Sequence, residues 1–240
     1  MGKAQRLKAE RAAEAARAAS IAAARGRGTN GGRTLPVFWI VFGAIIVIAI
    51  AVLVIASGSG TNDKSPSISQ RAFSTVNKSG ASLPAYTGKG TDSAVGRIAP
   101  VISGTDVDKR PISIGGPSDR PTMVLFVAHW CPHCQAEIPR LTKYLKQHGG
   151  LPADVRLVTV ATASSKTKPN FPPGAWLARE KWPAEVLLDD EVATGLDAYG
   201  TGAFPYFVEL DKSGKVVKRQ SGEITMGDFA ADLKALVAAK

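Results

Sequence analysis

The pentapeptide at residues 130–134, WCPHC, constrains the fold of this chain most, because it contains both cysteines of the 240 residues. It directly follows the apolar run 123–128, and such a run before Cys-x-x-Cys is typical of a buried strand that leads into a helix. A thiol at the start of a helix meets unpaired backbone N–H groups and the positive end of the helix dipole, which stabilise its thiolate. The second thiol, one turn further on, can resolve a mixed disulfide formed by the first. The pattern therefore predicts a redox-active pair, Cys131 and Cys134.

A second feature, the absence of charge from residues 37–56, predicts a membrane anchor. A helix of 20 apolar residues spans about 30 Å, the thickness of the hydrocarbon core of a bilayer. We therefore predict a transmembrane helix over residues 36–56, uncleaved because the apolar run is longer than the core of a signal peptide. The leader 1–35 holds eight Lys and Arg but two acidic residues, which favours a cytoplasmic N-terminus and extracytoplasmic cysteines. In a bacterial-type cell that side of the membrane is oxidising.

The charge and composition of the rest of the chain limit its possible domain organisation. The net charge is +10, of which six charges belong to the leader; the rest forms no basic stripe, so nucleic-acid binding is not expected. Residues 57–95 are rich in Ser, Gly, Thr, Asn and Lys and poor in apolar side chains, which predicts a flexible extracytoplasmic tether. The folded domain is then expected over residues 96–240, which is long enough for one core.

Apolar periodicity along the folded domain predicts alternating strands and helices. Ile138, Leu141 and Leu145 follow the cysteines at helical spacing. A capping-box pattern at Thr225 and Asp228 begins the last helix. The strands are expected in a hairpin at 101–114, in the runs 123–128, 155–161 and 185–189, and in a second hairpin at 207–217. This order predicts an α/β fold with a mixed sheet flanked by helices on both faces.

Four features of residues 95–240 occur together. They are the segment Gly96 to Pro100 before a short hairpin, the WCxxC junction of strand and helix, Pro139 eight residues after Cys131, and the segment Gly202 to Phe207 before the last hairpin. Together they resemble the thioredoxin superfamily, and within it the membrane-anchored TlpA/ResA-like branch. The resemblance implies a thioredoxin-like fold and a protein thiol–disulfide oxidoreductase that needs no cofactor.

The resemblance also implies a role for each residue around the cysteines. Cys131 is expected to be the exposed attacking thiolate and Cys134 the more buried resolving thiol. Pro205 is expected to be a cis-proline that faces the disulfide. The residues expected to contact substrate are Trp130, Pro132 and Phe204. The implied partners are cysteine-containing substrate proteins and a redox partner in the membrane that recycles the pair.

The histidine between the cysteines leaves the redox direction open. Pro132-His133 matches the motif of DsbA-type oxidants, and a charged or hydrogen-bonding His133 stabilises the Cys131 thiolate, which makes the disulfide a better oxidant. The TlpA/ResA-like architecture, in contrast, is commonly reductive. Many relatives carry a buried acidic residue six positions before the first cysteine, where this chain has Leu125. Glu137 is close in sequence but is expected further along the helix, so it is assigned no proton relay.

Two other functions are compatible with parts of the pattern. His129, Cys131, His133 and Cys134 are soft or borderline ligands that could hold copper or zinc. Strand alternation, however, should point His129 away from the helix start, so no metal ligand is predicted. A peroxiredoxin-like peroxidase normally has Thr or Ser and Pro shortly before its cysteine, and the residues at 128–130, AHW, do not match.

Overall fold

The computed structural model describes residues 71–200 and 202–239. The predicted leader 1–35, the predicted transmembrane helix 36–56 and the first residues of the predicted tether lie outside the described residues. In the part of the chain that the structure describes, no helix is long and apolar enough to cross a membrane.

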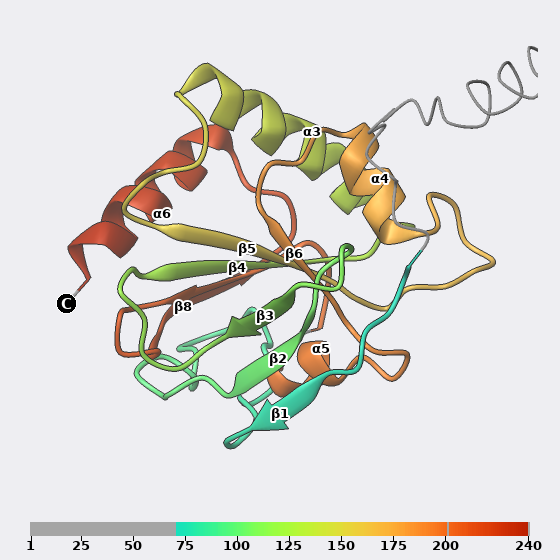
Figure 1. Ribbon diagram of the computed structural model, residues 1–240. Coiled ribbons are helices and arrows are strands. Elements are labelled where there is room, and N and C mark those ends of the chain that lie inside the picture. The colour runs from blue at the N-terminus through green and yellow to red at the C-terminus, as the bar shows by residue number, and fades with distance from the viewer. Residues whose placement is uncertain (1–70, 201, 240) are drawn as a thin grey trace, which may run out of the picture. The chain divides into compact units, whose positions relative to one another are not determined.

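A five-stranded mixed sheet lies at the centre of the domain (Figure 1). The strands are β4 (Thr122–Val127), β5 (Arg156–Ala161), β6 (Glu185–Leu188), β7 (Tyr206–Leu210) and β8 (Val216–Ser221). Their spatial order is β6-β5-β4-β7-β8. β4, β5 and β6 are parallel, whereas β7 and β8 are each antiparallel to the preceding neighbour. Every residue of β4 is buried, which explains the nearly continuous apolar run of this central strand.

Three helices cover one face of this sheet (Figure 1). They are α3 (Pro132–Gln147), α4 (Pro173–Arg179) and α6 (Met226–Ala238). Ile138, Leu141 and Leu145 of α3 are buried, as their helical spacing predicts. They belong to the same core as Trp176 of α4 and Phe229 of α6. This core holds α3, and with it the cysteines, against the end of β4.

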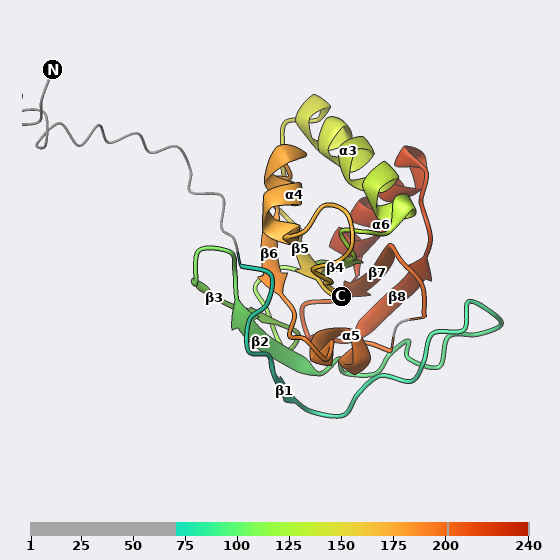
Figure 2. The same cartoon turned by 90° about the vertical axis from the view of Figure 1, so that its right-hand side faces the viewer.

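The opposite face carries a small antiparallel sheet and one helix (Figure 2). These elements are β1 (Asn77–Ser79), β2 (Val101–Thr105), β3 (Pro111–Ile114) and α5 (Thr194–Ala198). Ile102 and Ile114 of the small sheet pack with Phe126 of β4 and with Tyr199 after α5. The predicted hairpin at 101–114 is confirmed, but it belongs to a separate three-stranded sheet. The predicted mixed sheet with helices on both faces is confirmed.

Residues 71–95 pack against the domain, so the prediction of a flexible tether is wrong for this part of the chain. Strand β1 pairs with β2 along its whole length. The apolar side chains of the segment that become buried are Ala72, Val76, Leu83 and Ala94. Backbone hydrogen bonds also join Leu83 and Tyr86 to the end of α5. A few small side chains and backbone bonds are therefore enough to hold a segment of polar composition.

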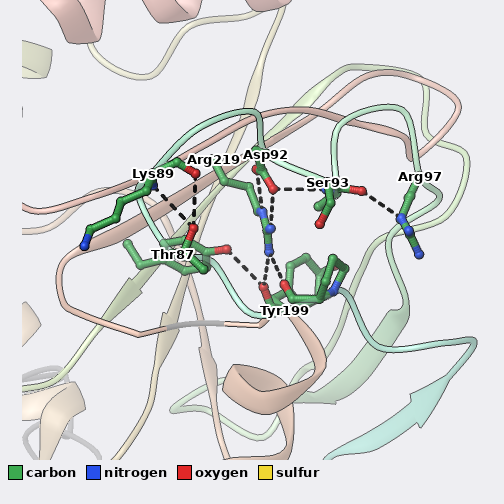
Figure 3. Close-up of polar contacts among 10 residues, drawn as sticks. Thr87, Lys89, Asp92, Ser93, Arg97, Tyr199 and Arg219 are labelled. Carbon is green, nitrogen blue, oxygen red and sulfur yellow. Dashed lines mark hydrogen bonds and ion pairs between the residues drawn. The ribbon is translucent and has the colours of Figure 1, made fainter.

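A buried arginine on β8 fastens this segment to the domain (Figure 3). The Arg219 guanidinium donates to the Asp92 carboxylate at 2.8 Å, and this contact is the main reason that the Asp92 pKa is lowered. Arg219 also donates to the carbonyl oxygens of Pro84 at 2.8 Å and Tyr199 at 3.2 Å. The Tyr206 hydroxyl donates to the same Tyr199 carbonyl at 3.0 Å. The cluster therefore joins the N-terminal segment to the chain between α5 and β7.

Candidate active site

The two cysteines lie where β4 leads into α3. Cys131 is the N-cap residue of α3, and Pro132 occupies the start of the helix, where its missing N–H sacrifices no intrahelical hydrogen bond. Cys131 keeps 7% of its surface exposed, whereas Cys134 is fully buried. Both cysteines are free thiols. Burial is the main reason that the pKa of the Cys134 thiol lies far above its ordinary value.

The loop before β7 lies next to the Cys131 thiol, which is nearly buried, contrary to the expectation of an exposed thiolate. The Phe204–Pro205 peptide bond is cis, as the resemblance implies, and Pro205 is buried. The Cys131 Sγ lies 3.9 Å from the Phe204 carbonyl oxygen. The rings of Phe204 and Trp130 pack edge to face, with centroids 6.3 Å apart. The predicted site residues from α3 and from this loop are thus brought together around Cys131.

His133 lies on the exposed side of the cysteine pair and contacts a residue from the far end of the sequence. Its Nδ1 is 2.8 Å from Oε1 of Glu223, in the loop between β8 and α6. The other carboxylate oxygen of Glu223 accepts from Arg140 of α3 at 2.8 Å. The sequence reasoning missed Glu223, because 90 residues separate it from His133 and no local pattern links them.

Glu137 lies beneath the site, one helical turn after Cys134. Its side chain is fully buried, and its Oε2 is 3.2 Å from the Arg140 guanidinium. Burial raises the pKa of this carboxyl group, and the Glu137 charge in turn helps to raise the pKa of Cys134. Leu125, which occupies the position six residues before Cys131 where many relatives have an acidic residue, is buried and apolar. The i, i+3 spacing from Cys134 was the signal that could have identified Glu137.

His129 turns away from the cysteines, as strand alternation predicts. Its side chain is buried, and Nδ1 lies 2.6 Å from the Pro169 carbonyl oxygen. Nε2 accepts a hydrogen bond from the Ser165 N–H at 3.1 Å. Both ring nitrogens therefore bind the backbone of the loop between β5 and α4. Within the described residues, no group of three or more His, Cys, Asp or Glu side chains is placed to hold a metal ion.

The fold and the site together define a class of protein. A Cys-x-x-Cys pair that begins a helix and faces a cis-proline, on a mixed sheet with helices on both faces, is a thioredoxin-like dithiol protein. The sequence model of the AhpC/TSA family matches residues 95–219, and the chain belongs to this family.

Two curated relatives and one solved structure are similar to the chain. The "Thiol:disulfide interchange protein TxlA homolog" of Synechocystis sp. is 30% identical over 128 residues, 53% of this chain and 56% of the relative. The "Thiol-disulfide oxidoreductase ResA" of Geobacillus thermodenitrificans is 26% identical over 143 residues, 60% of this chain and 78% of the relative. The crystal structure of StoA from Bacillus subtilis has a TM-score of 0.47 and 21% identity, and covers 58% of this chain and 98% of that chain.

The similarity to the first of these relatives spans little more than half of its length. Both curated relatives are named as oxidoreductases of thiols and disulfides. The enzyme class predicted from the sequence, a protein thiol–disulfide oxidoreductase, is consistent with these names.

Proposed function

We propose that the chain exchanges the Cys131–Cys134 disulfide or dithiol with cysteines of substrate proteins. The observation that carries this proposal is the asymmetry of the pair: Cys131 begins α3 and keeps 7% of its surface exposed next to the Phe204 carbonyl oxygen, whereas Cys134 is fully buried behind it. Trp130 and Pro132 flank Cys131 in the sequence, Phe204 lies next to its thiol, and these are the side chains that an incoming substrate segment would meet. The names of the curated relatives support the same chemistry.

The reaction consists of two thiol–disulfide exchange steps, and electrons are conserved in both. In the oxidising direction, a substrate thiolate attacks Sγ of Cys131, the disulfide breaks, and Cys134 leaves as a thiolate that takes up a proton. A second substrate thiolate then attacks the substrate sulfur of the mixed disulfide and releases the Cys131 thiolate. The substrate loses two electrons, and the cysteine pair gains them. The reducing direction is the reverse of both steps.

We favour the oxidising direction, because His133 stands beside Cys131 and is held by Glu223. A positive group near Cys131 stabilises the reduced form of the pair and so raises its reduction potential. The test is the equilibrium of the full-length protein with glutathione buffers. A potential near −120 mV supports the oxidising direction, and a potential near −270 mV, as in thioredoxin, contradicts it and supports a reductase.

We further propose that residues 36–56 anchor the protein in a bacterial-type membrane, with the cysteine domain on the extracytoplasmic side. The uncharged run and the positive leader support this topology. A partner within the membrane would then return the cysteine pair to its starting redox state. A membrane-impermeant thiol reagent should label reduced Cys131 in intact cells that express the full chain. Labelling only after the cells are lysed would contradict the topology.

A further inference from the structure

An ionic contact joins the start of α3 to the loop between β8 and α6, which is distant in sequence. His133 Nδ1 and Glu223 Oε1 are 2.8 Å apart, and the His133 side chain is otherwise largely exposed. An exposed pair of this kind contributes little to stability by itself. Its position is what matters here, because His133 is two residues from Cys131 and shares its helical turn.

The protonation states of this contact follow from its chemistry. A carboxylate can only accept a hydrogen bond, so the proton between the two side chains belongs to Nδ1 of His133. The hydrogen bond from His133 is the largest cause that lowers the pKa of Glu223, and Arg140 lowers it further. Glu223 is therefore ionised at neutral pH.

The Glu223 carboxylate is fixed from more than one side. Arg140 of α3 donates to its second oxygen at 2.8 Å and to the neighbouring Ile224 carbonyl oxygen at 2.7 Å. The N–H of Gly222 donates to the Pro205 carbonyl oxygen at 2.8 Å. The loop that carries Glu223 is thus bound both to the cysteine helix and to the cis-proline loop, so the carboxylate has little freedom to leave His133.

We propose that Glu223 is a positioning residue whose carboxylate fixes the ring and the Nδ1 proton of His133 beside Cys131 and thereby stabilises the reduced state of the cysteine pair. The inference rests on the proposed function, since it concerns the potential of the same disulfide. Arg140 contacts both Glu223, at 2.8 Å, and the buried Glu137, at 3.2 Å, so the cation of α3 nearest to Glu223 is shared between two carboxyl groups.

The test is the reduction potential of full-length Glu223→Gln, measured in glutathione buffers beside the unaltered protein. Glutamine keeps an oxygen that can accept from His133 but carries no charge. We expect the equilibrium constant to shift about tenfold toward the disulfide, which lowers the potential by about 30 mV. Glu223→Asp retains the charge and should recover at least half of the shift. Glu191→Gln, an exposed glutamate between β6 and α5, is the matched control and should leave the potential unchanged.

A second pair of variants shows whether Glu223 acts through His133. In a His133→Ala background, Glu223→Gln should shift the equilibrium constant less than twofold, because the group it positions is gone. An unchanged potential for Glu223→Gln, or an equal shift in the two backgrounds, would overturn the inference while the exchange reaction stands. If the unaltered protein exchanges no disulfide with glutathione, the proposed function fails and the inference fails with it.

Discussion

The two thiols have different environments although they are only one helical turn apart. Cys131 keeps 7% of its surface exposed at the helix start, next to the Phe204 carbonyl oxygen. Cys134 is fully buried and holds its proton firmly, since burial raises its pKa. Cys134 must lose that proton before it can attack Cys131, and the buried carboxyl group of Glu137 is close enough for its charge to affect the Cys134 pKa. We therefore expect proton transfer beneath the site to be a step of the proposed exchange.

We predict that Glu137→Gln slows the resolution of a mixed disulfide on Cys131 by about tenfold to a hundredfold, because the amide cannot take up the Cys134 proton. The lost charge also makes Cys134 easier to deprotonate, so a net slowing reports on proton transfer. The measurement is the rate at which Cys134 releases glutathione from Cys131 in a rapid-mixing experiment.

Glu180→Gln, at the exposed end of α4, is the matched control for this measurement. It should leave the resolution rate unchanged. Alkylation of Cys131 should proceed at a similar rate in all three proteins. Resolution by Glu137→Gln that is as fast as in the unaltered protein would exclude the proton-transfer role.

The residues that sequence reasoning could find are those within a motif or at a fixed offset from it. Cys131, Cys134 and Pro205 belong to such patterns, and the structure places them together. Glu223 was not predicted, because it reaches His133 only when the loop after β8 folds back onto α3. The sequence assigned no role to Glu137, because its burial depends on the packing of α3 against the loop before α6 and not on the local sequence.

The loop between β5 and α4 is an element that one buried side chain holds in place. Nδ1 and Nε2 of His129 bind the Pro169 carbonyl oxygen and the Ser165 N–H. Only the neutral ring with its proton on Nδ1 satisfies both contacts, since Nε2 must accept. The Trp130 indole N–H also donates to the Ala163 carbonyl oxygen in this loop, at 2.7 Å. The loop is therefore fastened directly beside the active-site cysteines.

We predict that acidification releases this loop. Burial lowers the His129 pKa below its ordinary value of 6.5, so the folded protein keeps the ring neutral after the unfolded chain has been protonated. The stability that His129 contributes is therefore fully present above the pKa that the ring has in the unfolded chain. It is lost as the pH falls through the lowered pKa of the folded protein. Hydrogen exchange of the Ser165 amide, compared at about pH 7 and about pH 4, measures the release.

His129→Ala should leave the Ser165 amide unprotected at both pH values, which gives the reference for a released loop. The amides of β4 should stay protected throughout, because their partners lie within the sheet. Full protection of the Ser165 amide at the lower pH would contradict the role of His129.

At the scale of the whole molecule, the domain begins earlier than composition suggests. Residues 57–95 have few apolar side chains, and this led to the prediction of a tether ending at residue 95. In the structure, residues 71–95 are instead held by the pairing of β1 with β2 and by an ion pair between Asp92 and Arg219. These two residues are 127 residues apart in sequence. Contacts over that separation leave no local signature. The order of strands and helices was predictable because it depends on local apolar periodicity.

We predict that a fragment of residues 96–240 is less stable to urea than a fragment of residues 66–240. The shorter fragment loses β1 and the Asp92 and Pro84 oxygens that accept from the Arg219 guanidinium. In the longer fragment Arg219 stays buried, and loss of the carboxylate of a buried ion pair costs about 3 to 5 kcal/mol. Asp92→Asn in the longer fragment removes the charge alone and should account for a large part of the difference. Equal unfolding midpoints for the two fragments would contradict the packed N-terminal segment.

Trapping a mixed disulfide tests most directly whether Cys131 carries the exchange and Cys134 resolves it. Reduced full-length Cys134→Ser is mixed with oxidised glutathione, and the products are analysed by mass spectrometry. We predict one glutathione adduct, on Cys131, that persists because no second thiol resolves it. Cys131→Ser should form its adduct far more slowly, since Cys134 is buried. The account would be contradicted by adducts at equal rates on the two variants, or by no adduct on Cys134→Ser.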